Sequence, residues 1–256
     1  MGLKKRLDQV LVEQGLAQSR QKGKAMIMAG LVEVDGIRAA KAGQPVKASA
    51  TITVRRPPSY VSRGGQKLEA AIRHFDLDVT SLVMLDVGAS TGGFTDCLLK
   101  HGAGKVIAVD VGYGQLDWKL RQDPRVKVLE RTNIRYVQPQ DLEEFPHGAV
   151  VDTAFISLRQ VIPPVTHLLQ SRAFIIALIK PQFEVGKGRV GKGGVVRDPL
   201  LHQEVIDDLR SFFEGLGWEV AGCIPSPLLG PKGNREFLMV VKRESDQVRK
   251  VNSHTK

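Results

Sequence analysis

The sequence predicts an α/β protein in which a Rossmann-like, seven-stranded sheet follows a small N-terminal α+β domain. A short apolar strand, a glycine-rich turn and the start of a helix succeed one another over residues 82–96. This order builds nucleotide pockets in open α/β sheets. Gly88, Gly92 and Gly93 are expected to remove side chains where a ligand must approach the backbone. Alternating strand and helix patterns continue to about residue 242. The first 60 residues are strongly basic, and this difference in composition indicates a separate domain.

The N-terminal domain is expected to cover residues 1–54, with two helices followed by a small sheet. Apolar residues at helical spacing over residues 7–11 mark the first helix. Ser19 is placed to cap a second helix that stops near Gly30. Alternating apolar residues at 32–34 and 51–54 predict short strands.

Positive charge is concentrated in this domain. Residues 1–60 hold 11 Lys and Arg against 4 Asp and Glu, whereas the remaining 196 residues hold 26 against 23. A small domain with this excess is a candidate for binding a phosphate backbone, because Lys and Arg release the counterions that surround nucleic acids. A basic surface that is merely solvated is the alternative.

The second domain is expected over residues 62–245, after a proline-containing linker at 55–61. It opens with a helix whose apolar residues, between 68 and 75, share one face. Together with the strand before the glycine turn, six later strands make a mostly parallel sheet, and the final hairpin supplies an antiparallel strand. Those six strands are expected near residues 105–110, 126–129, 149–156, 173–179, 219–224 and 236–242. The basic tail at 246–256 is expected to be disordered.

The glycine turn favours S-adenosylmethionine as the cofactor. Residues 86–93 fit D-x-G-x-x-x-G-G, the pattern of methyltransferases that use it, whereas the dehydrogenase pattern G-x-G-x-x-G needs glycine in place of Ser90. The next strand ends in Asp110, where an acidic side chain can accept hydrogen bonds from both ribose hydroxyls. A turn and a strand-end aspartate that serve packing alone are the alternative. The residues expected to bind the cofactor are Asp86, Gly88, Ser90, Gly92, Phe94, Thr95, Asp110 and Asn133.

Four charged residues lie where packing alone does not account for them. Asp152 interrupts an apolar strand, Lys180 ends one and Glu236 begins one, while Lys67 lies on the first helix of the second domain. In such sheets ligands meet the carboxyl ends of strands, so the strand-end residues are expected to face one crevice with the two aspartates of the cofactor pattern. Each of the four could also be an ordinary salt bridge or a surface charge.

The segment RLDQVLVEQGLAQSRQKGKAMIMAGLVEVDG resembles the alpha-L RNA-binding domain of small-subunit ribosomal protein four and of several RNA-modifying enzymes. The resemblance rests on the order R-L-D, then S-R, then G-x-V-x-V-x-G. It implies that a basic helical face is set against structured RNA, which is read mainly through shape and phosphates. The expected RNA contacts in this domain are Arg6, Arg20, Lys22 and Lys24.

The motifs SRGGQKL, VDTAFISL, LIKPQFEVG and GNREFLMV, with DVGASTGGFTD, resemble those of the TlyA family of rRNA 2′-O-methyltransferases. In that family an RNA-binding domain precedes an FtsJ-like catalytic domain, and the resemblance extends from about Lys4 to Lys242. It implies methylation of a cytidine ribose, with ribosomal RNA or a ribosomal subunit as partner. The FtsJ-like catalytic tetrad of Lys, Asp, Lys and Glu falls on Lys67, Asp152, Lys180 and Glu236.

Methyl transfer to a ribose hydroxyl requires alignment of the oxygen with the methyl carbon and removal of a proton. Lys180 is the candidate base, because the Lys67 ammonium, the sulfonium and desolvation would all favour the neutral form of its amine. Asp152 and Glu236 act in the opposite direction, so an orienting role for Lys180 is the alternative.

A glycine-rich loop at 184–198 carries several Lys and Arg beside Lys180. We expect this loop to act as a basic lid that closes over RNA, with Lys187 and Arg189 as contacts. A loop with no role is the alternative. Its G-x-x-x-x-G-K stretch lacks the following Ser or Thr of a phosphate-binding loop, which argues against an ATPase.

Composition and the cysteine pattern narrow the classes of protein to which the chain could belong. The chain has no apolar run of membrane-spanning length and no signal-peptide pattern, so no membrane partner and a cytoplasmic location are expected. Cys97 and Cys223 lack metal-ligand spacing, and no metal site is expected. Oligomeric state stays open, because no heptad or spare apolar stripe suggests an interface. Some members of the family that this chain resembles are labelled haemolysins, so a pore-forming protein is one alternative function. A non-catalytic RNA-binding or ribosome-assembly factor is the other.

Overall fold

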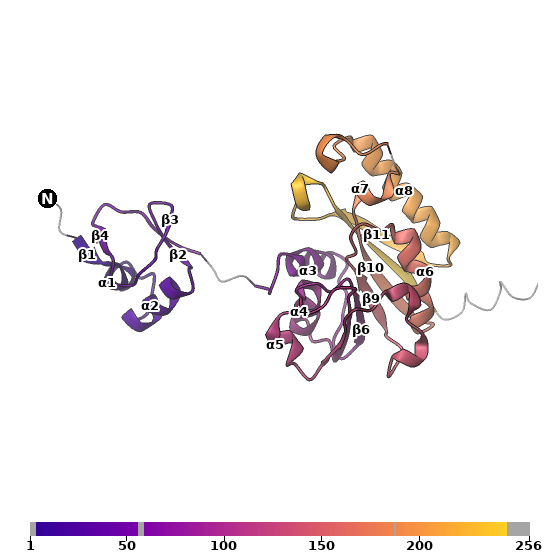
Figure 1. Ribbon diagram of the computed structural model, residues 1–256, viewed down its shortest axis with the longest axis horizontal. Coiled ribbons are helices and arrows are strands. Elements are labelled where there is room, and N and C mark those ends of the chain that lie inside the picture. Colours follow the sequence, from indigo (N-terminus) through magenta and orange to yellow (C-terminus); the bar gives the residue numbers. More distant parts are fainter. Residues whose placement is uncertain (1–3, 56–58, 187, 245–256) are drawn as a thin grey trace, which may run out of the picture. The chain divides into compact units, whose positions relative to one another are not determined.

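The computed structural model describes residues 4–55, 59–186 and 188–244. The chain divides into two units, Met1–Pro58 and Ser59–Lys256, each drawn in Figure 1. Three parts of the sequence predictions lie outside the described residues: positions 56–58 of the linker, Lys187, and the tail at 246–256.

In the N-terminal unit, helices α1 (Leu7–Glu13) and α2 (Arg20–Met28) share a core with short strands. The predicted cap of α2 is confirmed, because Ser19 Oγ accepts a hydrogen bond from the backbone N–H of Lys22 at 3.2 Å. Strand β1 precedes the helices and pairs antiparallel with β4. The sequence prediction missed both of these strands and β3. A second sheet has the order β3-β2-β5. The strands are β1 (Lys4–Arg6), β2 (Val32–Val34), β3 (Ile37–Arg38), β4 (Pro45–Lys47) and β5 (Ile52–Val54).

The second unit is built on a seven-stranded sheet of order β11-β12-β10-β9-β6-β7-β8. The strands from β10 to β8 in this order run parallel, and β12 is antiparallel to both of its neighbours. The predicted Rossmann-like sheet with one antiparallel strand is therefore confirmed. The strands are β6 (Val83–Val87), β7 (Lys105–Val109), β8 (Val126–Leu129), β9 (Gly148–Val151), β10 (Ala173–Ile179), β11 (Glu219–Pro225) and β12 (Phe237–Arg243).

Helices cover both faces of this sheet (Figure 1). On one face, apolar residues of α3 (Gly64–His74), α4 (Gly93–Lys100) and α5 (Trp118–Arg121) pack in one cluster with the strands. On the other face, α6 (Leu158–Leu168) and α8 (Pro199–Gly215) form the second cluster. The remaining short helices are η1 (Ile134–Tyr136), η2 (Pro139–Asp141), α7 (Pro181–Glu184), η3 (Lys192–Gly194) and η4 (Pro231–Gly233). Among the described residues, no helix is both long and apolar enough to cross a membrane.

The apolar face predicted for the first helix of this domain is confirmed. Leu68, Ala71 and Ile72 of α3 are buried against the sheet, and Phe75 packs on the same cluster. This packing fixes the position of Lys67, which lies on the same helix, relative to the strand ends.

Candidate active site

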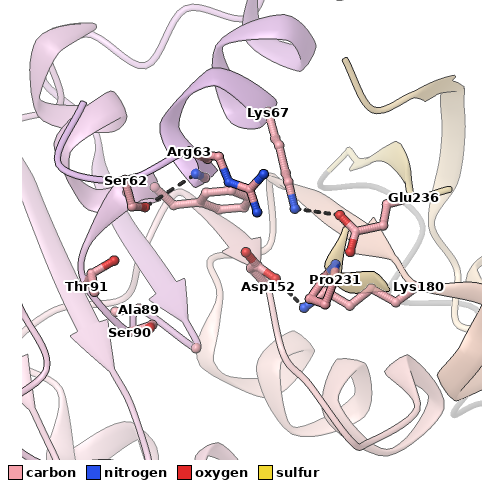
Figure 2. A pocket seen from close by; sticks show the side chains of 14 residues that line it. Ser62, Arg63, Lys67, Ala89, Ser90, Thr91, Asp152, Lys180, Pro231 and Glu236 are labelled. Atoms are coloured by element: carbon pink, nitrogen blue, oxygen red, sulfur yellow. Dashed lines mark hydrogen bonds and ion pairs between the residues drawn. The ribbon is translucent and has the colours of Figure 1, made fainter. Parts of the chain in front are cut away.

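Two adjoining cavities open where β6, β9 and β10 end (Figure 2 shows the smaller). The larger, of about 470 Å³, extends over the ends of β6 and β7, and the smaller, of about 280 Å³, lies beside α3. Gly88, Ser90 and Asp152 line both cavities. A molecule that occupied both would therefore pass between the end of β6 and the end of β9.

The larger cavity combines apolar walls with two polar residues predicted from the sequence. The carboxylate of Asp110 accepts hydrogen bonds from the backbone N–H of Ser90 at 2.8 Å and of Gly112 at 2.7 Å. Each carboxylate oxygen keeps a second lone pair for a ligand. Asn133 accepts from the backbone N–H of Arg135 at 3.1 Å and so caps η1. The apolar residues of the walls are Val87, Val109, Val111, Ile134, Ala154, Phe155, Ile156 and Val161.

Gly88 is needed for a reason that differs from the one expected. It has φ +85°, and a Cβ built on it would lie 2.5 Å from the backbone carbonyl oxygen of Asp152. The sequence argument assigned the missing side chain to the ligand. The structure shows that the close approach of two strand ends already excludes any side chain at this position.

Three of the predicted cofactor residues lie behind the turn and line neither cavity. Asp86 is fully buried, and one of its carboxylate oxygens accepts a hydrogen bond from the Thr95 hydroxyl at 2.6 Å. Burial raises the pKa of Asp86 to about 7, and the charges of Asp152 and Asp110 act in the same direction. Gly92 has φ +93°, and a Cβ there would meet the side chain of Leu120 at 2.3 Å. These residues are placed to shape the turn, whereas the predicted residue Phe94 does line the smaller cavity.

The smaller cavity brings together the four charged residues that the sequence singled out (Figure 2). Lys67 Nζ of α3 lies 2.5 Å from Glu236 Oε2, just before β12. The Glu236 side chain is completely buried and that of Lys67 is 12% exposed. Gly230 lies close against the other carboxylate oxygen, because a Cβ on it would be 2.0 Å from Oε1. A side chain at position 230 would therefore displace the carboxylate of Glu236.

The second pair joins the ends of β9 and β10. Lys180 Nζ lies 2.5 Å from Asp152 Oδ1 and donates a hydrogen bond to the backbone carbonyl of Thr153 at 2.9 Å. The two side chains are 11% and 24% exposed, so both are reached from the cavity rather than from open solvent. Two lysines and two carboxylates thus lie in one small cavity, and their charges balance.

Other lining residues had no place in the sequence prediction. Ser62 and Arg63, at the start of α3, line the smaller cavity together with Pro231 (Figure 2). Phe155 lines the larger cavity, is 90% exposed and has φ +63°. The sequence prediction placed Phe155 inside a strand, because apolar residues resume at Ala154 after the polar pair 152–153 and continue to Ile156. In the structure β9 ends at Val151, and the left-handed backbone of Phe155 lies in the loop that follows it.

The predicted RNA contacts of the N-terminal unit fall into two kinds. Lys22 and Lys24 are exposed on α2. Arg6 and Arg20 both contact the carboxylate of Asp8, Arg6 with two hydrogen bonds of 2.9 and 3.0 Å and Arg20 at 3.4 Å. The hydrogen bond from Arg6 is the main cause that lowers the pKa of Asp8 to about 2. Asp8 therefore holds two half-exposed guanidinium groups side by side.

The glycine-rich loop is fastened at its C-terminal half. The buried side chain of Asn234 accepts a hydrogen bond from the backbone N–H of Val196 at 3.1 Å and donates one to the carbonyl of Gly194 at 3.0 Å. Arg189, a predicted RNA contact, forms a two-pronged ion pair with Glu204 of α8. Its charge is thus already matched within the chain.

Fold and site together are those of a Rossmann-like methyltransferase with an RNA-binding domain. The FtsJ-like methyltransferase family matches residues 60–243, and the S4 domain matches residues 5–52. The chain belongs to the TlyA family of FtsJ-like methyltransferases.

Three relatives illustrate this membership. The 16S/23S rRNA (cytidine-2′-O)-methyltransferase TlyA of Mycobacterium tuberculosis is 45% identical over 96% of this chain and 93% of its own length. Hemolysin A of Brachyspira hyodysenteriae is 41% identical over 91% of this chain and 98% of its own. A solved structure from Streptococcus thermophilus that carries a hemolysin label has a TM-score of 0.73 and 41% identity, and it covers 94% of this chain and 88% of its own.

Proposed function

We propose that this protein transfers a methyl group from S-adenosylmethionine to the 2′-hydroxyl of a cytidine in ribosomal RNA. The observation that carries the proposal is the smaller cavity, where two lysine–carboxylate pairs adjoin a cavity suited to a nucleoside. The relative from Mycobacterium tuberculosis, which is named for this reaction, supports it.

The residues present fit S-adenosylmethionine. The larger cavity offers apolar walls for the base, Asp110 for the ribose hydroxyls and Asn133 beside the base. Gly88 and Ser90, which line both cavities, would lie along the path from the nucleoside to the methionine portion. When bound, this cofactor supplies an electrophilic methyl group attached to a sulfonium, and the sulfur departs as a neutral thioether once the methyl group is transferred.

Lys180 is assigned the task of accepting the proton from the ribose hydroxyl. Its Nζ directs two hydrogen bonds, one to Asp152 and one to the carbonyl of Thr153. A neutral amine has two N–H groups and one lone pair, so these two acceptors use both donors and leave the lone pair for the hydroxyl proton. Asp152 and Thr153 thereby aim the lone pair.

Lys67 and Glu236 are assigned a supporting role at the other side of the cavity. The Lys67 ammonium faces the cavity while the buried carboxylate of Glu236 fixes its position. A cation held here favours negative charge that develops on the attacking oxygen, and its rigid placement avoids reorganisation during transfer. The four residues together thus orient the hydroxyl and remove its proton.

In this proposal the S4 domain binds structured RNA through Lys22, Lys24 and the two guanidinium groups, of Arg6 and Arg20, that contact Asp8. We assign ribosomal RNA, free or within a ribosomal subunit, as the partner, and hence a cytoplasmic location, because the relative from Mycobacterium tuberculosis is named for methylation of 16S and 23S rRNA. A monomer suffices for the chemistry described, since one chain provides both cavities.

Purified protein, S-adenosylmethionine labelled in its methyl group and separated ribosomal subunits test this function. We expect label in RNA and a new 2′-O-methylcytidine on mapping, and neither with Asp152→Ala. Label in protein or no label at all would reject the proposal.

The hemolysin names of two similar proteins motivate a second assay. Leakage from liposomes by the wild-type protein, undiminished in Asp152→Ala, would show a membrane activity unrelated to methyl transfer. Binding of ribosomal RNA without transfer would instead favour a ribosome-assembly factor.

A further inference from the structure

Glu184 ends helix α7 and reaches the start of α6. Its Oε2 accepts a hydrogen bond from the Ser157 hydroxyl at 2.6 Å, and its Oε1 accepts one from the backbone N–H of Leu158 at 2.9 Å. Ser157 Oγ itself accepts from the backbone N–H of Arg159 at 3.1 Å. Glu184 therefore completes the N-terminal cap of α6, an end at which a carboxylate is favoured.

These bonds are one end of a longer seam between two segments, the loop 152–157 and the stretch 180–184. At the other end, Lys180 contacts Asp152 and the carbonyl of Thr153. In the middle, the rings of Phe183 and Phe155 lie 5.2 Å apart. Both ends of the loop, and its middle, are thus attached to a single short stretch of chain.

The loop held by this seam is not in a relaxed conformation. Phe155 has φ +63°, a region that bulky residues avoid, and the residue is 90% exposed. Such a conformation persists only where the surrounding contacts fix it. If the end at Ser157 were released, the loop could relax and Asp152 would lose its fixed approach to Lys180.

Burial of the Glu184 carboxylate is unfavourable, and this supports a specific role for it beyond helix capping. Burial raises the pKa of this carboxyl, whereas the hydrogen bonds from Ser157 and Leu158 and, to a smaller extent, the charge of Arg159 act in the opposite direction. Among the described residues it has no ion-pair partner within salt-bridge distance. An ordinary cap could be provided by Ser157 alone, so the carboxylate is more than the helix end requires.

We propose that Glu184 is a positioning residue for methyl transfer, which holds the 152–157 loop through Ser157 and Leu158 so that Asp152 meets Lys180. This inference rests on the proposed function, and it assigns Glu184 no contact with substrate or cofactor.

Two substitutions at this position separate its roles. Glu184→Ala removes both hydrogen bonds, whereas the amide oxygen of Glu184→Gln can still accept from Leu158. We expect kcat to fall by about tenfold or more in Glu184→Ala, to stay within about threefold in Glu184→Gln, and the dissociation constant for S-adenosylmethionine to change little in either. Glu214→Ala, an exposed glutamate on α8, is the matched control and should leave kcat unchanged.

A double-mutant cycle with Lys180 distinguishes a positioning role of Glu184 from a purely structural one. In single-turnover assays, Glu184→Ala should slow transfer in the wild-type background but have little further effect when Lys180 is already alanine. Equal losses in both backgrounds would overturn the proposal. If Glu184→Ala fails to fold, Ser157→Ala replaces it, and a full rate in that variant would overturn the proposal as well. Failure of the wild-type protein to methylate ribosomal RNA would instead refute the proposed function.

Discussion

Removing the charge of Glu236 should destabilise the catalytic domain and abolish transfer. In Glu236→Gln the Lys67 ammonium, 12% exposed, would lose a carboxylate that lies 2.5 Å away and is fully buried. Breaking a buried pair from one side costs about 3–5 kcal/mol, and the residual exposure of Lys67 favours the lower end. For a domain of this size, about 3 kcal/mol corresponds to a fall in melting temperature of roughly 6–12 °C.

The double variant Lys67→Met/Glu236→Gln separates stability from chemistry. Because no charge is left unpaired, it should recover much of the melting temperature while methyl transfer stays lost. Arg73→Met is the matched control, since it breaks the exposed ion pair with Glu69 on the same helix and should cost at most about 0.5 kcal/mol. Thermal unfolding and a methyl-transfer assay on the same samples measure both effects. Recovery of activity in the double variant would refute the reasoning, because the pair would then be only a structural one.

Three further outcomes are expected. Lys180→Ala should keep its affinity for S-adenosylmethionine in calorimetry while transfer falls by about 100- to 10,000-fold, and a loss of only a few-fold would contradict its role as base. Because the pKa of Asp86 is raised from 3.8 to about 7, the stability that this residue contributes is fully present below about pH 4 and is lost as the pH rises through about 7. Urea unfolding of the wild type between pH 4 and 8 should show this loss, and Asp86→Asn should flatten it; identical profiles would place the titration elsewhere. A chain that begins at Ser59 should bind S-adenosylmethionine but hold ribosomal RNA weakly, with the slope of log K against log salt reduced by about 0.7–0.9 for each phosphate that the shorter chain no longer binds. An unchanged slope would make the basic charge of the first domain a solvated surface.

The number of strands, their mostly parallel direction and the nature of the pocket could be predicted from the sequence. Short apolar runs separated by helical patterns predict parallel strands, and the spacing around Gly88 predicts the turn. The end of β9 could not be predicted from the sequence. Ala154, Phe155 and Ile156 look like a continuation of the apolar strand, although they line a cavity and lie outside the sheet. An apolar side chain has the same letter in a core and at a ligand site, so hydrophobic pattern alone cannot separate the two.

The partners of the charged residues also required the structure. Lys67 and Glu236 are 169 positions apart, and nothing in the sequence indicates that Glu236 pairs with Lys67 and not with Lys180. The seven-stranded order decides this, because β12 inserts beside β10 and brings the residue before it to the side of α3. The position of Asp86 also required the structure, because this residue, predicted to contact the cofactor, lies behind the turn and accepts a hydrogen bond from Thr95 of the following helix.

The most direct test of the central claim is the 2′-O-methylation of ribosomal RNA in cells. Ribosomal RNA would be mapped for 2′-O-methylcytidine in three samples: cells that lack the gene, the same cells complemented with the wild-type chain, and the same cells complemented with Lys180→Ala. We predict at least one methylated cytidine that depends on the wild-type chain and is missing with Lys180→Ala. The same methylation pattern in all three samples would contradict the assignment of this site to ribose methylation.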